Sequence, residues 1–352
     1  MKNYLIGIVF LLAAFYLLWQ QGEVAREQST VDTAWDENQS LPSNQAFQPT
    51  EEKKSFTGEA TSFNEGEAQE DAFEVIQDAP EEELFEGMAN EYSTLQFTNY
   101  SGGLRKIDLN EFERLSRQFS MEHADEPFLA LAFEDDNGNL VKGAMGKPIA
   151  FELIEKSPDK VIYSWESGKN LRIQRTYTRN PDNGYQFNHS IVITNIGSQP
   201  LGLERLRLNL GSAIKIERMY NPFDYASTYL NVGYYNSGPA IPEGCSCATC
   251  SGRIDGEKDE FIQANEMGPS GRMETRYLSQ ARWACVNNQF FVNLIRPKTD
   301  MSDVRVSGQS IRLQGEEDPV GVKGAMSFPV GLLQPGASKE YDFEVYAGPK
   351  DY

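Results

Sequence analysis

Short runs of β-forming residues, each bounded by a turn, recur from about residue 91 onward and constrain the fold more than any other feature. Polar and apolar residues alternate in Leu171–Tyr177 and in Phe187–Ile193, as they do in strands with one face in water. Asn-Gly at 137–138 and Asp-Asn-Gly at 182–184 predict hairpin turns. Strands at this spacing, without helices between them, predict a sandwich of antiparallel sheets.

These patterns place one large all-β domain at residues 91–350, a length sufficient for a substantial core. A single helix is expected at Leu109–Ser120, because Phe112, Leu115 and Phe119 fall on one face of it. The expected strands are Ser93–Thr98, Phe128–Phe133, Ala150–Ile154, Lys160–Trp165, Leu171–Thr178, Tyr185–Asn195, Gly202–Leu210, Trp283–Ile295, Val304–Val306, Ser310–Leu313, Gly321–Pro329 and Glu340–Ala347.

An unbroken apolar run, Tyr4–Trp19, precedes this domain. At 1.5 Å per residue a helix of this length spans roughly 24 Å, and Lys2 and Trp19 can extend it to the two membrane interfaces. Lys2 on the N-terminal side predicts a cytoplasmic N-terminus and an exported main domain. A cleaved signal peptide is the alternative, but Glu23 stands where a cleavage site needs a small residue. We therefore expect a transmembrane signal anchor at residues 1–20 of a bacterial inner-membrane protein with a periplasmic domain.

The segment between the anchor and the β domain, residues 21–90, is strongly acidic. Between Gln20 and Asn90 lie 18 acidic and three basic residues, so this segment carries most of the net charge of −20. Its apolar residues are scattered singly, which predicts a disordered, extended tether. The acidity argues against binding to nucleic acid or adsorption to anionic lipid.

Motifs for catalysis are missing from the sequence. The two histidines, His123 and His189, form no H-x-x-x-H or H-E-x-x-H pattern, and neither a nucleophile turn of the G-x-S-x-G type nor a phosphate-binding loop occurs. No spacing selects a pair of carboxylates for acid–base chemistry. The sequence therefore predicts a chain that is not an enzyme and that needs no cofactor.

The four cysteines leave two hypotheses open. Cys245, Cys247 and Cys250 lie in a loop rich in Gly and Ser, and Cys285 begins an expected strand. A Cys₄ zinc site would use all four thiolates, whereas an exported compartment favours disulfides. We expect a disulfide in preference to zinc.

Three patches resemble the periplasmic part of the YidC membrane-protein insertase family. The first is Tyr92–Ile107, in which Gly102-Gly103 joins two strands, and the second is Trp283–Phe291, a strand with Trp283 that ends in Gln289, Phe290 and Phe291. The third ends the last strand in Gly348-Pro349-Lys350. The resemblance covers the anchor, the tether and the β domain in order, with these glycines, aromatic residues, Gln289 and Pro349 in structural positions.

Membership of that family would imply a β-supersandwich related to galactose-mutarotase-like domains. It would also imply a part in inserting and folding inner-membrane proteins, with nascent membrane proteins and Sec translocon subunits as partners. The membrane helices that form the insertase groove in that family are missing from this sequence, so we expect an N-terminal fragment. The alternative hypothesis is a membrane-anchored, mutarotase-like module that binds or epimerises carbohydrate, because such sandwiches can host sugar chemistry.

Overall fold

The computed structural model describes residues 82–110, 119–123, 126–135, 137–142, 148–168, 170–216, 229–239, 254, 256–267, 273–313 and 318–350. These residues form strands and connecting turns, and none of them belongs to an α-helix. Within the same residues, no helix has the length and hydropathy to cross a membrane. The strands are β1 (Phe85–Ala89), β2 (Ser93–Thr98), β3 (Leu104–Leu109), β4 (Phe119–Glu122), β5 (Leu131–Glu134), β6 (Leu140–Lys142), β7 (Glu152–Lys156), β8 (Lys160–Ser167), β9 (Leu171–Arg179), β10 (Gln186–Asn195), β11 (Leu201–Ile214), β12 (Asn231–Asn236), β13 (Lys258–Gln263), β14 (Glu274–Asn287), β15 (Phe291–Pro297), β16 (Met301–Ile311), β17 (Gly321–Leu333) and β18 (Ser338–Pro349).

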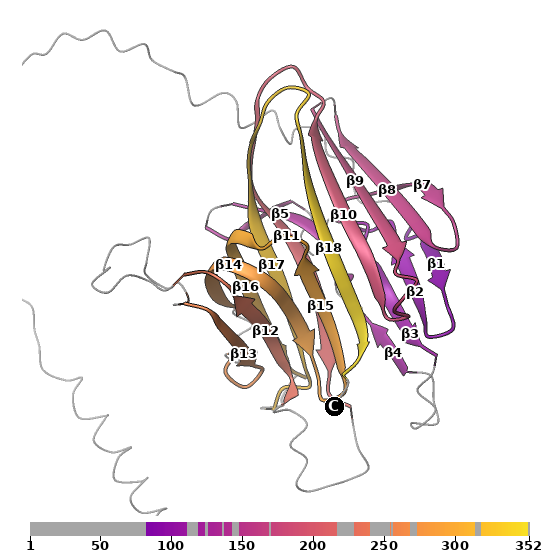
Figure 1. Cartoon of the computed structure of the whole chain (residues 1–352), viewed down its shortest axis with the longest axis vertical. Helices are drawn as coiled ribbons and strands as arrows, with labels where there is room; N and C mark the ends of the chain where they lie inside the picture. The colour runs from indigo at the N-terminus through magenta and orange to yellow at the C-terminus, as the bar shows by residue number, and fades with distance from the viewer. Residues whose placement is uncertain are drawn as a thin grey trace, which may run out of the picture. The chain divides into compact units, whose positions relative to one another are not determined.

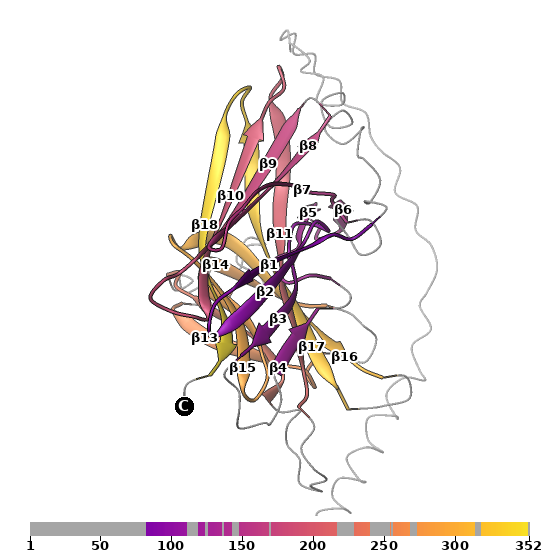
Figure 2. The same cartoon turned by 90° about the vertical axis from the view of Figure 1, so that its right-hand side faces the viewer.

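The described strands form two antiparallel sheets. The small sheet has the order β1-β2-β3-β4, and the large sheet has the order β6-β5-β11-β17-β16-β14-β15-β18-β10-β9-β8-β7, with β12 and β13 attached through β14. Figures 1 and 2 show the small sheet lying across one face of the large one. The expected all-β architecture is therefore confirmed.

Part of the core lies between the two sheets and follows from the alternation in the strands. In β9 the side chains of Leu171, Ile173 and Tyr177 are buried, whereas Arg172 and Gln174 are exposed. The ring of Tyr177 packs 4.7 Å from that of Phe97 in β2, so the two sheets meet directly. Placing apolar side chains on one face of each sheet removes them from water, which is the main stabilising contribution to such a sandwich.

Buried arginines also join the sheets. Arg179 in β9 donates through Nη2 to the carbonyls of Met88 (2.7 Å) and Ser93 (2.8 Å) in the small sheet. A buried guanidinium has five donors to satisfy, so it holds several backbone carbonyls in fixed positions. Burial lowers the pKa of Arg179 to about 10, which still leaves it charged at neutral pH.

Some sequence-based expectations need correction. Leu109, the expected start of a helix, ends β3, and Phe119 begins β4, while residues 111–118 lie outside the described residues.

Trp283–Ile295, expected as one strand, forms parts of β14 and β15. The side chain of Asn288 accepts the backbone N–H groups of Phe290 (2.9 Å) and Phe291 (2.8 Å) and so closes a turn between the two strands. Strand β1 lies before residue 91, the expected start of the β domain. The anchor at 1–20 and most of the linker fall outside the described residues.

Candidate functional site

His189, one of the two histidines, is part of the packed core. Its ring stacks on Tyr177 with 4.3 Å between centroids, Nδ1 lies 3.2 Å from the carbonyl of Thr176, and Nε2 lies 3.0 Å from Arg175. Burial first, and the Arg175 charge second, lower the pKa of His189 well below its usual value. The ring is therefore neutral, and both of its nitrogens have partners.

Arg175 fixes the turn between β2 and β3. Its guanidinium donates to the carbonyls of Ser101 and Leu129 as well as contacting His189. Gly102 has φ of 58°, and a Cβ on Gly103 would lie 2.6 Å from the carbonyl oxygen of Phe128. Gly102 therefore permits the positive φ of this turn, and Gly103 leaves room for the Phe128 carbonyl that a side chain would meet.

Two adjoining hollows, of about 240 and 180 Å³, form what we call the β4–β11–β15 groove. They share Glu122, Ser212 and Ile214, so residues from β4, β11 and β15 that are far apart in sequence converge here. Concave sites with a few convergent polar groups are the usual places for small-molecule binding. The lining includes Met121, Glu122, Glu126, Asn209, Gly211, Ser212, Ile214, Lys215, Asn288, Phe291, Asn293 and Lys323.

The carboxylates of the groove have different environments. Glu126 is held by Arg207, with Oε1 2.8 Å from Nη1, and Arg207 also lies 3.4 Å from Glu134. Glu122 is 70% exposed and has Lys106 at 3.9 Å. One carboxylate is therefore fixed by a charge partner and the other faces solvent, which allows the exposed one to meet a ligand.

His123 lies beneath this groove and is fully buried. Its Nδ1 accepts the backbone N–H of Ser212 at 3.2 Å. Burial, with a smaller effect of Arg105, lowers the pKa of His123 to about 3, so the ring is neutral. Its Nε2 and the Oδ1 of Asn293 are both buried without a hydrogen-bond partner among the described residues.

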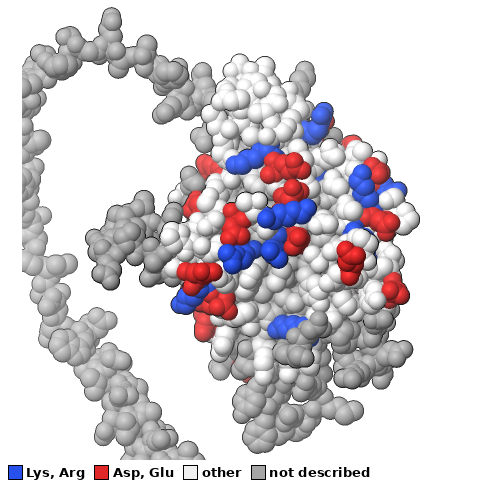
Figure 3. Space-filling model, viewed as in Figure 1, with Lys and Arg blue, Asp and Glu red and all other residues white. Residues whose placement is uncertain are grey.

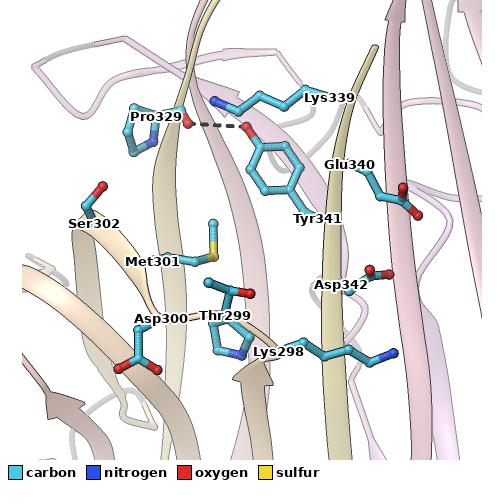
Figure 4. A pocket seen from close by; sticks show the side chains of 11 residues that line it. Lys298, Thr299, Asp300, Met301, Ser302, Pro329, Lys339, Glu340, Tyr341 and Asp342 are labelled. Carbon is cyan, nitrogen blue, oxygen red and sulfur yellow. Dashed lines mark hydrogen bonds between the residues drawn. The ribbon is translucent and has the colours of Figure 1, made fainter.

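A second cleft of about 350 Å³ lies between β17 and β18, where the two strands diverge after their hairpin turn (Figure 4). Tyr341 reaches across it, and its hydroxyl donates to the carbonyl of Pro329 at 3.3 Å. Lys339 donates to the carbonyl of Val330 at 2.8 Å, and Asp300 accepts from Ser237. Acidic and basic side chains are interspersed over the molecular face seen in Figure 3. Several polar groups of this cleft already form hydrogen bonds within the protein, so we prefer the β4–β11–β15 groove as the ligand site.

Cys285 is a buried free thiol in β14. Burial raises the pKa of Cys285 to about 11, which makes it unreactive. The other three cysteines, Cys245, Cys247 and Cys250, fall outside the described residues, so the disulfide and zinc hypotheses stay predictions. Among the described residues, no group of three or more His, Cys, Asp or Glu side chains could hold a metal.

The three patches that carry the YidC resemblance converge in space. Phe291 pairs with Pro349, and the backbone N–H of Lys350 donates to the carbonyl of Phe290 at 2.7 Å. A Cβ on Gly348 would lie 2.8 Å from the ring of Tyr185. That ring also contacts Tyr92 of the first patch, at 5.7 Å between centroids.

Trp283 lies apart from this contact, packed on Tyr235 (6.3 Å) and Phe261 (6.1 Å). Gln289 occupies the turn between β14 and β15.

No model of a known protein family matches the chain, and no curated protein matches its sequence. Among solved structures, a galactose mutarotase related enzyme from Lactobacillus acidophilus is 7% identical, with a TM-score of 0.50 over 76% of this chain and 100% of the other. A galactose mutarotase-like protein from Lactobacillus casei is 9% identical, with a TM-score of 0.51 over 75% of this chain and 100% of the other. The described domain therefore has a galactose mutarotase-like fold.

This likeness corrects the expectation that the chain is not an enzyme. That expectation depended on missing motifs, yet the fold is one that a protein described as an enzyme also adopts. The groove itself escaped the sequence analysis, because its lining comes from segments that only the sheet order brings together. One pattern could have revealed part of it: Asn293 occupies a core-facing position in the otherwise apolar run Phe291–Ile295.

Proposed function

We propose that the described domain is a mutarotase-like carbohydrate-binding or epimerase module whose ligand site is the β4–β11–β15 groove. The observation that carries this proposal is the combination in one groove of an exposed carboxylate, Glu122, with the amide of Asn293 and the apolar side chains of Met121 and Phe291. Sugar hydroxyls hydrogen-bond to carboxylates and amides, and the C–H faces of a pyranose pack on apolar side chains. The fold supports the proposal by analogy.

Epimerisation at the anomeric carbon would need two proton transfers. A base removes the proton of the anomeric hydroxyl while an acid protonates the ring oxygen, so the bond between the anomeric carbon and the ring oxygen breaks and an open-chain aldehyde forms. Closure on the other face of the carbonyl, with the protons returned, completes the exchange. Both histidines are buried and Glu126 is paired with Arg207, so among the described groove residues Glu122 is the candidate base, and solvent water would supply the proton to the ring oxygen.

The test uses the whole chain, purified in a detergent that contains no sugar headgroup. Monosaccharides are titrated against it by calorimetry, and the rate of anomer exchange of pure α-aldoses is followed by polarimetry. We expect saturable binding that Glu122→Gln weakens about tenfold or more, since a hydrogen bond to a charged group contributes about 1.5–3 kcal/mol.

Glu340→Gln, in the other cleft, is the matched control and should bind as the unaltered protein does. Binding that is absent for every aldose, or that is insensitive to Glu122→Gln, would refute the carbohydrate proposal.

We also propose a second function, that of the N-terminal, periplasmic part of a YidC-type insertase that assists the insertion of inner-membrane proteins. The observation that favours it is that the three resembling patches lie close together. Pro349 of the third patch pairs with Phe291 of the second, and Gly348 of the third patch and Tyr92 of the first both contact the ring of Tyr185. Sequence segments that resemble a family in order and also pack together are what a shared domain requires.

In this second role the cleft between β17 and β18 is the candidate contact site. β17 pairs with β16 only up to Ser327, and β18 pairs with β15 only from Phe343, so among the described residues each strand has an edge on the cleft without a neighbouring strand. Side chains of β18 occupy the carbonyls of Pro329 and Val330 on the first edge, so an added segment would have to displace them. An extended segment can add to such an edge through backbone hydrogen bonds. The proposed partners are nascent membrane proteins or Sec translocon subunits.

A photo-crosslinking residue tests this role. It is placed at Glu340 in the cleft and, as the matched control, at Glu122 in the groove, in the whole chain within inner-membrane vesicles that carry a stalled membrane-protein intermediate. We expect the Glu340 position to link to the stalled chain or to a Sec subunit, and the Glu122 position not to. Equal labelling from both positions, or none from Glu340, would contradict the second proposal.

A further inference from the structure

The β4–β11–β15 groove is made of two hollows whose linings differ. The hollow of about 180 Å³, which we call the polar hollow, includes Glu126, Asn209 and Lys323 in its lining. The hollow of about 240 Å³, which we call the apolar hollow, is lined mostly by apolar side chains, among them Met121, Ile216, Val286, Phe291 and Val292. One part of the groove therefore suits hydrogen-bonding groups and the other suits hydrocarbon.

The two hollows meet at Glu122, Ser212 and Ile214, which line both of them. The side chain of Glu122 is 70% exposed and Ile214 is 50% exposed, so the junction carries both a carboxylate and a hydrocarbon side chain that are accessible to a ligand. Pockets for small molecules typically measure about 300–1,000 Å³, and neither hollow reaches that volume alone. A ligand that fills the groove therefore extends across the junction into both hollows.

Hydrogen bonds within the protein fix the walls of the apolar hollow. Asn288 donates through Nδ2 to the carbonyl of Ile214 at 3.0 Å, while its Oδ1 holds the turn between β14 and β15. The backbone N–H of Lys215 donates to the carbonyl of Val320, just before β17, at 2.8 Å. The end of β11 is thus tied to both neighbouring segments, so a ligand would not have to order these walls on binding.

We propose that the groove takes a sugar joined to an apolar group, with sugar hydroxyls at Glu122 and the apolar group in the apolar hollow. This inference rests on the proposed carbohydrate function and names its ligand class. A bare monosaccharide would leave the hydrocarbon around Ile214 and Val292 in water. A hydrocarbon without hydroxyls would remove Glu122 from water without replacing its hydrogen bonds, which is costly. A sugar with an apolar substituent is complementary to both hollows.

The test measures affinity as the apolar group is lengthened. Methyl, ethyl, propyl and butyl β-glucopyranosides and β-galactopyranosides are titrated by calorimetry into the whole chain in a detergent without a sugar headgroup, and into the same detergent alone. A second series of the two sugars carries the alkyl group on O6, because the lining is compatible with attachment at either end of the ring. We expect the affinity in at least one series to rise about fourfold for each CH₂ that enters the apolar hollow.

Two substitutions separate the two parts of the ligand. Val292→Thr replaces a methyl group of the apolar hollow by a hydroxyl at nearly constant volume. It should reduce the gain per CH₂ and change the affinity for the methyl compound by less than about twofold. Glu122→Gln should weaken every member of a series by the same factor and leave the gain per CH₂ unchanged. Ile154→Thr, at a side chain of β7 that is 60% exposed, is the matched control and should alter neither quantity.

The outcomes separate this inference from the proposed function. Methyl compounds that bind through Glu122, with an affinity that rises along neither series, would overturn the inference and leave the carbohydrate function in place. A rise that Val292→Thr leaves intact would also overturn it, since the apolar group would then lie elsewhere. An affinity that 1-butanol reproduces and Glu122→Gln does not alter, or no binding by any compound, would overturn both.

Discussion

Mild acid should destabilise this protein through its buried histidines, before its carboxylates titrate. Burial first, and Arg105 second, hold the pKa of His123 at about 3 in the folded state. In the unfolded chain a histidine titrates near its ordinary value of about 6.5. Between these two values the unfolded state binds a proton that the folded state does not, so the free energy of unfolding decreases as the pH falls.

The magnitude follows from the same two pKa values. Each pH unit below about 6.5 costs about 1.4 kcal/mol per histidine, so His123 alone should lower the free energy of unfolding by about 2 kcal/mol at pH 5. His189 acts in the same direction, because burial and then Arg175 lower its pKa well below the usual value. Against a typical total of 5–15 kcal/mol, such a loss is easily measured.

Urea unfolding of the whole chain, followed by tryptophan fluorescence at several pH values from 7.5 to 5, measures this slope. Unpaired carboxylates titrate near pH 4, so they contribute little in this window. We expect His123→Gln to remove the share of the slope that belongs to that residue, and Glu340→Gln, an exposed control, to leave the slope unchanged. A free energy of unfolding that is constant from pH 7.5 to 5 would show that the histidines are not buried as described.

Three further predictions concern packing. Gly103→Ala places a Cβ 2.6 Å from the Phe128 carbonyl and should lower the free energy of unfolding, measured by chemical denaturation, by about 1–3 kcal/mol. The control Gly202→Ala, whose Cβ would have nothing within 4 Å, should change it by less than about 0.5 kcal/mol. Equal losses in the two variants would refute the steric argument. Arg175→Met leaves the Ser101 and Leu129 carbonyls without their donor and should lower the free energy of unfolding by about 2–4 kcal/mol, and an unchanged value would contradict its proposed hold on the turn. In a variant with Cys245→Ser, Cys247→Ser and Cys250→Ser, Cys285 should react with a thiol reagent only after urea is added. Its side chain is buried, and burial raises its pKa to about 11. Rapid reaction of the folded protein would argue against that burial.

The strands that could be predicted from the sequence are those that keep one face in the core and the other in water over their whole length. β9 and β10 have one face in the core and one in water, so their alternation is visible in the sequence. β13 begins Lys258-Asp259-Glu260 and has a single buried side chain, that of Ile262, so no local pattern marks it as a strand. It exists through pairing with β12, which is a contact between distant segments. Such pairing is a tertiary effect that overrides local propensity.

The candidate groove could not be predicted for a related reason. Glu122, Ser212 and Asn293 become neighbours only because β4 and the sheet positions of β11 and β15 bring them together. The YidC resemblance and the mutarotase-like alternative both led to a sandwich of this kind, so the fold does not choose between them. The choice between the two proposed functions therefore depends on whether the groove binds aldoses and whether the cleft crosslinks to a partner protein.

The two histidines illustrate how satisfaction of hydrogen bonds separates a structural side chain from a candidate binding one. Both are buried and neutral, although His189 lies in an alternating strand and His123 lies among acidic residues in the sequence. His189 has Arg175 on one nitrogen and the Thr176 carbonyl on the other, so it has no remaining capacity for a ligand. His123 has a partner on Nδ1, and its buried Nε2 has none among the described residues. Because an unpaired buried polar atom is costly, His123 keeps a capacity for one further hydrogen bond that His189 lacks.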